Sequence, residues 1–241
     1  MQSSIGNCAE NKKETTPAKK MRYAEIDTLK GIAILLVVLG HSIIFYPINL
    51  HENRVCNWIF EWLSSVHMPL FFAVSGFCFS YKGNYTGYLW KKVRRIGIPY
   101  LVFNLIDMFP RTLFPQFVNR DRSIKDSLIS IALYGGEYWF LYVLFGIFFI
   151  FPAIKKVCEK YKYMPAIIAV VIIVLNLLKI ECSIFLLDKL ILALLYFFGG
   201  YMVKKIWGYS VFKKKRASAV IVLILGFYCC GKFSKLFNIL G

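Results

Sequence analysis

Residues 29–42 read LKGIAILLVVLGHS, an apolar run interrupted by two strongly polar side chains, Lys30 and His41. The apolar segment that contains it, residues 28–46, is about as long as a helix must be to cross the hydrocarbon core of a bilayer. Because the two positions are eleven residues apart, a helix places them about 16 Å apart along its axis and about 20° apart around it. One helix face therefore carries a cation at the membrane edge and an imidazole inside the membrane, where ionisable groups are costly and usually functional.

Six further apolar segments follow, at residues 58–81, 96–114, 138–153, 164–179, 187–203 and 217–231. Their lengths are close to what membrane crossing requires. Apolar residues make up 58% of the chain and the mean hydropathy is +0.58, whereas a soluble globule is only about half apolar. The sequence therefore predicts an all-α, multi-pass helical bundle in the lipid bilayer, with about seven transmembrane helices.

The chain carries 30 Lys and Arg residues against 13 Asp and Glu residues, a formal charge of +17. The basic residues lie in short clusters between apolar segments, including residues 82–95, which is typical of cytoplasmic loops and argues against a nucleic-acid partner. If the spans alternate, 20 of the 30 fall on the side of the N-terminal tail. The positive-inside rule therefore predicts a cytoplasmic N-terminus and a location in the cell membrane. We expect residues 1–22 to be a disordered cytoplasmic tail and residues 23–241 to form the membrane domain.

A second histidine, His67, lies near the middle of the second apolar segment and is followed closely by Pro69. The proline removes a backbone donor and is expected to kink the helix, which can open a small polar cavity in a membrane protein. Because the first two spans run in opposite directions, His41 and His67 are expected at similar depth. The pair either forms interhelical hydrogen bonds or supplies an imidazole for general-base chemistry, with His67 in a supporting role.

Residues 91–95, KKVRR, form a basic cluster next to the third apolar segment. Such a cluster can anchor the topology by reaching lipid phosphates. Alternatively, Arg94 and Arg95 can bind a phosphorylated cytosolic ligand, because the guanidinium fork matches phosphate oxygens. Lys30 is also expected near the cytoplasmic boundary, so the sequence permits all three cations to contact one anionic donor.

Two further side chains are candidates for substrate contact or for support of the site. Asp107, in the third apolar segment, could orient an imidazole or pair with Arg111 one helical turn away. Trp139 opens the fourth segment within YWFLY, where anchoring at the membrane interface is the alternative role. The seven cysteines include no zinc-type C-x-x-C pair, and we expect no metal site.

Several blocks of residues resemble the membrane acyltransferase 3 family, the cell-surface glycan O-acetylases that include nodulation-type fucose acetylases. The blocks are Asp27-x-Leu29-Lys30-Gly31-Ile32-Ala33 with His41 after it, His67-Met68-Pro69-Leu70-Phe71-Phe72-x-x-Ser75-Gly76-Phe77, Arg94-Arg95-x-x-x-Pro99-Tyr100, Trp139-Phe140-Leu141 and Phe198-Gly199. The resemblance implies acyl transfer from cytosolic acyl-CoA, a co-substrate rather than a tightly bound cofactor, to a sugar hydroxyl. It further implies that Lys30 and His41 are the essential pair, and that Arg94 and Arg95, with Lys30, hold the coenzyme phosphates.

The sequence is therefore interpreted as that of a membrane O-acyltransferase, an acetylase acting on a surface glycan or its lipid-linked precursor. His41 would either remove the proton of the acceptor hydroxyl or briefly carry the acyl group, since imidazole is both a base and a nucleophile. The alternatives are a glycan or lipid transporter that uses the same polar residues as a permeation path, and a catalytically inactive remnant. Members of the family usually continue with additional spans, so we expect residues 23–241 to be an incomplete domain at the C-terminus.

Overall fold

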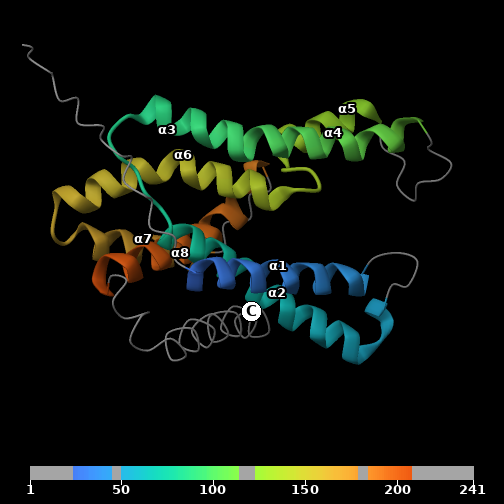
Figure 1. Ribbon diagram of the computed structural model, residues 1–241, viewed down its shortest axis with the longest axis horizontal. Helices are drawn as coiled ribbons and strands as arrows, with labels where there is room; N and C mark the ends of the chain where they lie inside the picture. The colour runs from blue at the N-terminus through green and yellow to red at the C-terminus, as the bar shows by residue number, and fades with distance from the viewer. Residues whose placement is uncertain (1–23, 45–49, 114–122, 179–183, 208–241) are drawn as a thin grey trace, which may run out of the picture.

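The computed structural model describes residues 24–44, 50–113, 123–178 and 184–207. These parts of the chain are helical and contain no strand, which confirms the predicted all-α fold for them (Figure 1). The helices are α1 (Ala24–Ile44), α2 (Arg54–Phe77), α3 (Tyr85–Lys92), the π-helical turn η2 (Val93–Gly97), α4 (Ile98–Leu113), α5 (Ile124–Leu133), α6 (Trp139–Lys160), α7 (Met164–Leu177) and α8 (Leu187–Trp207), with short 3-10 turns η1 (Leu50–Glu52) and η4 (Ile184–Leu186).

Three described helical stretches are long and apolar enough to cross a membrane: Ile26–Ile43, Trp139–Lys160 and Ile184–Ile206. Helix α7 is apolar but only 14 residues long, and the N-terminal half of α2 carries polar residues such as Asn57 and Glu61. The tail at residues 1–22 and the seventh apolar segment, 217–231, lie outside the described residues. Three of the seven predicted spans thus correspond to helices able to cross a membrane, while the predicted number is not established.

The largest difference from the sequence-based expectation concerns residues 82–95, predicted as a loop. The structure shows helix from Tyr85 onward, and α3, η2 and α4 follow one another without a break (Figure 1). Asn84 begins this helix, because its side chain accepts a hydrogen bond from the backbone N–H of Gly87 at 3.1 Å. Basic residues that the hydropathy pattern assigned to a loop therefore lie on helical turns, which α6 packs against.

Helix α2 is central to the packing and contacts α1 on one side and α8 on the other. The contact with α8 is close because glycines lie at the crossing. A Cβ atom added at Gly76 would overlap the backbone carbonyl of Phe197, and one added at Gly200 would overlap the carbonyl of Ala73. Two helices that approach so closely gain extensive van der Waals contact, which is the main source of association inside a membrane.

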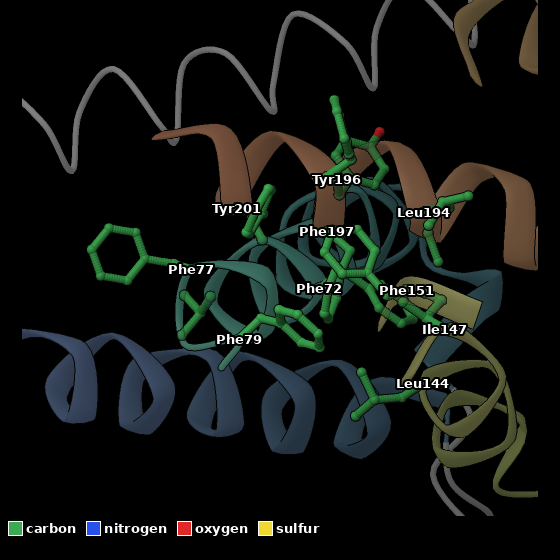
Figure 2. Packing of buried hydrophobic residues seen from close by; sticks show 14 of the residues in the cluster. Phe72, Phe77, Phe79, Leu144, Ile147, Phe151, Leu194, Tyr196, Phe197 and Tyr201 are labelled. Atoms are coloured by element: carbon green, nitrogen blue, oxygen red, sulfur yellow. The ribbon is translucent and has the colours of Figure 1, made fainter. Parts of the chain in front are cut away.

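An aromatic core forms where α2 meets α6 and α8 (Figure 2). Phe79, just beyond the end of α2, lies edge-on to Phe151 of α6 at 4.8 Å and to Phe197 of α8 at 5.8 Å between ring centroids. Phe151 and Phe197 are completely buried. Such edge-to-face pairs are the favoured arrangement of aromatic rings, and here they join the C-terminal end of α2 to the middle of α6 and of α8.

Candidate active site

His67 is the buried imidazole of the site, with 6% of its surface exposed. Its Nδ1 atom lies 2.6 Å from the backbone carbonyl oxygen of Leu63, one turn earlier on α2. Because a carbonyl oxygen can only accept, Nδ1 must carry the hydrogen of this bond. In the neutral tautomer Nε2 then has a lone pair, and the ring can accept a proton or a hydrogen bond there.

His41 lies on α1 with its side chain exposed, and α1 packs against α2, the helix that carries His67. A Cβ atom added at Gly40 would lie 4.0 Å from the ring of Phe60, which precedes His67 by two turns on α2. The two histidines predicted to be at similar depth thus lie on neighbouring helices, with His41 beside a part of α2 that is about two turns from His67. One imidazole is held by a backbone carbonyl, and the other is accessible from outside the described bundle.

Lys30 is half-exposed on α1 and forms an ion pair with Asp27 at 3.7 Å. The residues of α1 that face α2 and α8 form a buried stripe, namely Ile26, Leu29, Ala33 and Gly40. Lys30 and His41 each follow a member of this stripe by one residue, so both lie on its flank. The shared helix face predicted from their spacing thus borders the packed core rather than entering it.

Arg94 and Arg95 lie on the π-helical turn η2, and both side chains are exposed. The Arg94 guanidinium stands over the ring of Trp90 at 5.8 Å. The turn packs beside the middle of α6, since Gly97 approaches Phe145 and the Lys92 ammonium lies 3.4 Å from the ring centroid of Phe148. A π-helical turn within a helix is uncommon and is found frequently at functional sites, so the location favours a binding role for the arginines over a simple anchor.

The contacts of the described helices do not assemble Lys30 with the two arginines. Helix α1 packs mainly on α2 and η1, whereas η2 packs on α3, α4 and α6. The end of α1 near Lys30 adjoins α8, because Ile26 and Leu29 line one small apolar pocket together with Val203. The two groups of cations predicted to share one ligand therefore lie on elements with different neighbours.

Trp139, the first residue of α6, is half-buried, and the ammonium of Lys189 lies over its ring at 4.5 Å. Its neighbour Phe140 packs against Phe71 and Phe72 of α2, at 5.4 and 4.9 Å between ring centroids. Since Phe71 is one turn from His67, Trp139 is joined to the histidine helix through these aromatic contacts.

Asp107 is half-buried on α4, but the side chain of its predicted partner Arg111 lies outside the described residues.

Sequence reasoning gave no site role to two lysines that the structure places at the end of α2. Lys155 of α6 donates a hydrogen bond to the carbonyl of Tyr81 at 2.9 Å, and Lys204 of α8 donates one to the carbonyl of Phe79 at 3.0 Å. Both residues entered the sequence analysis only as charges that set the topology. The partners are 74 and 125 residues apart in the sequence, so no local pattern could have revealed them.

Among the described side chains, no three His, Cys, Asp or Glu residues are grouped so that they could hold a metal ion.

A family model described as an acyltransferase domain matches residues 23–238. The chain therefore belongs to the acyltransferase 3 family, a family of membrane-embedded proteins, as its motifs predicted. It is similar to the nodulation protein NolL of Mesorhizobium japonicum, with 26% identity over 133 residues that cover 52% of this chain and 34% of the relative. The nodulation protein NolL of Sinorhizobium fredii is 28% identical over 134 residues, covering 53% of this chain and 35% of that protein. The matched region thus spans about a third of the length of these relatives, and no solved structure matches the chain.

Proposed function

We propose that this protein is a membrane-embedded O-acyltransferase that transfers an acyl group, in particular acetyl, from cytosolic acyl-CoA to a sugar hydroxyl. The acceptor is a surface glycan or its lipid-linked precursor. The proposal includes about seven transmembrane helices, a cytoplasmic N-terminus and a location in the cell membrane. Family membership and the similarity to nodulation proteins support it.

The observation that carries the proposal is the histidine pair. Acyl transfer from a thioester to a hydroxyl needs a group that removes the hydroxyl proton as the oxygen attacks the carbonyl carbon. The carbon–sulfur bond then breaks, and the proton passes to the departing sulfur, giving the ester and the free thiol. His41 is the accessible imidazole, and His67, oriented by Leu63, is the buried imidazole on the helix against which α1 packs.

Two routes remain for His41 within this proposal. In the first, its imidazole takes the proton of the acceptor hydroxyl, which attacks the thioester directly. In the second, the imidazole attacks the thioester carbonyl carbon, the carbon–sulfur bond breaks and the thiol leaves with the imidazole proton. The acceptor hydroxyl then attacks the acyl-imidazole, the carbon–nitrogen bond breaks and the hydroxyl proton returns to the imidazole. In either route His67 would be a positioning residue, because its ring is buried and its Nδ1 hydrogen bond to Leu63 holds it in one orientation.

The donor would bind through the exposed guanidinium groups of Arg94 and Arg95. Coenzyme A carries several phosphate oxygens, and guanidinium groups bind phosphate in a bidentate manner. The π-helical turn supports this role because it presents both arginines outward from the middle of a long helical stretch. Lys30 would contribute a further cation if the donor reaches α1.

We expect Arg94→Ala combined with Arg95→Ala to raise the KM for acyl-CoA by about tenfold or more, with little change in kcat. Contacts to phosphates stabilise bound donor and transition state alike, and each lost charge-assisted hydrogen bond costs about 1.5–3 kcal/mol. The double variant Lys160→Ala with Lys162→Ala removes the same charge elsewhere and serves as control. Initial rates in membrane vesicles at varied acetyl-CoA test the prediction, and an unchanged donor KM would leave the arginines as a topology anchor.

The function itself is tested by following the acyl group. Membrane vesicles that contain the protein are given acetyl-CoA with a radiolabelled acetyl group, and label is measured in the base-labile fraction of glycan and lipid-linked saccharide. An acyltransferase incorporates label in proportion to the protein present. A transporter would move saccharide across the vesicle membrane without incorporation, and that result would replace the proposal.

A further inference from the structure

Four lysines gather where α6 and α8 end, around the turn that follows α2. They are Lys155 and Lys156 of α6 and Lys204 and Lys205 of α8, and we call them the helix-end lysine cluster. Lys155 and Lys204 donate hydrogen bonds to the carbonyls of Tyr81 and Phe79, which are two residues apart, so the two helices place like charges close together. In the described part of the chain, the carboxylate that forms an ion pair with this cluster belongs to Glu159, which lies 3.4 Å from Lys155. The cluster therefore carries more positive than negative charge.

Three of these ammonium groups donate hydrogen bonds to backbone carbonyls. Lys155 and Lys204 reach the carbonyls of Tyr81 and Phe79 in the turn after α2, and Lys205 reaches the carbonyl of Cys158 near the end of α6 at 3.3 Å. Carbonyls at and beyond a helix C-terminus lack helical partners and attract cations. Each ammonium has three donors, so one bond to a carbonyl does not saturate it.

The turn that these lysines hold connects the two halves of the candidate site. It follows α2, which carries His67, and precedes the helix that leads to Arg94 and Arg95. Within the turn, the Tyr81 hydroxyl donates a hydrogen bond to the carbonyl of Gly83 at 3.0 Å. A ligand bound to the cluster would therefore affect how the helix that carries His67 is placed relative to the turn that carries Arg94 and Arg95.

The position of the cluster indicates the kind of ligand. Helices α6 and α8 are both long and apolar enough to cross a membrane, and all four lysines lie in their last two turns. Lysines at such helix ends extend toward the headgroup layer. The rings of Tyr81 and Tyr201 lie at the same ends, and Lys155 and Lys156 both stand 5.9 Å from the Tyr81 ring.

We propose that the helix-end lysine cluster binds the phosphate group of an anionic membrane lipid, and that the bound headgroup bridges α6 and α8 and stabilises the turn after α2. An anion between Lys155 and Lys204 relieves their mutual repulsion and uses donors that the carbonyl bonds leave available. A soluble phosphate compound has the same binding chemistry. The cluster lies at the ends of two candidate spans, where lipid headgroups are expected, and this position favours a lipid phosphate over a soluble one.

The test measures the thermal midpoint of the full chain purified in a neutral detergent. Phosphatidylglycerol, phosphatidylcholine or inorganic phosphate is added at equal concentration, and each shift is taken from the same protein's lipid-free value. We expect phosphatidylglycerol to raise the midpoint of the wild-type protein by about 2–4 °C relative to phosphatidylcholine. The Lys155→Gln, Lys156→Gln double variant should lose most of this shift. The Lys160→Gln, Lys162→Gln double variant, with the same charge change near the same helix end, should keep it.

Equal shifts with the two lipids, or equal loss in both double variants, would overturn the site. A rise with inorganic phosphate that depends on Lys155 and Lys156 would overturn the lipid assignment in favour of a soluble ligand. If the first double variant does not fold, Lys156→Gln alone decides, since the described contact of Lys156 is with the Tyr81 ring and not with the backbone. That variant should lose part of the shift, and a full wild-type shift would contradict the proposal.

Discussion

His41→Ala is expected to lower acyl transfer by about 10²–10⁴-fold, the usual contribution of a general acid–base group, and by more if the imidazole carries the acyl group. The side chain is exposed on α1, so its removal leaves no cavity and should not affect folding. The measurement is the acetate released by mild base from the surface glycan of a strain that carries the variant at equal protein level.

The matched control is Ser42→Ala, which changes the next residue of the same helix. Ser42 is exposed, and its hydroxyl donates to the carbonyl of Leu39 in its own helix at 2.8 Å, so the site should lose nothing when it is removed. Wild-type acetylation in the His41 variant, or equal loss in both variants, would exclude His41 from the reaction.

Gly200→Leu is expected to disrupt the packing of α8 on α2. Even a Cβ atom at this position would overlap the backbone carbonyl of Ala73, and a backbone cannot move aside as a flexible side chain can. Overpacking of a well-packed core typically costs about 1–3 kcal/mol, and an overlap with the main chain should cost at least that much. We expect a lower thermal midpoint and a loss of the monodisperse peak in size-exclusion chromatography.

The neighbouring glycine provides the control for this prediction. A Cβ atom at Gly199 meets no atom within 4 Å, so Gly199→Leu should retain the wild-type midpoint and elution profile. If both substitutions behave alike, the close crossing of α2 and α8 is not what holds the bundle together.

Hydropathy alone was sufficient to predict the helical fold, because spans of apolar residues have few alternatives in a bilayer. It misassigned residues 82–95 because their lysines and arginines lower the mean hydropathy, although these residues lie on helical turns. The π-helical turn at Val93–Gly97 could not be predicted, since its backbone hydrogen bonding differs from that of an α-helix without a recognisable residue pattern.

Part of the candidate site was also predictable. Two antiparallel spans predicted that His41 and His67 lie on neighbouring helices, and the structure packs α1 on α2. The proposed sharing of one donor by Lys30 and Arg94 relied only on their common side of the membrane, which does not determine lateral position. The role of a side chain such as Lys204, whose carbonyl partner is 125 residues away in the sequence, can be recognised only once the packing of the helices is known.

The most direct test of the central claim is thiol release from acetyl-CoA in membrane vesicles of the expressing strain, where native acceptors are present. Wild-type protein and His41→Ala are compared at equal protein level, with vesicles that lack the protein as background. We predict release that scales with wild-type protein and falls to background in the His41 variant. Equal release by the two proteins, or no release above background by the wild-type protein, would contradict a His41-dependent transfer of acyl groups from acyl-CoA.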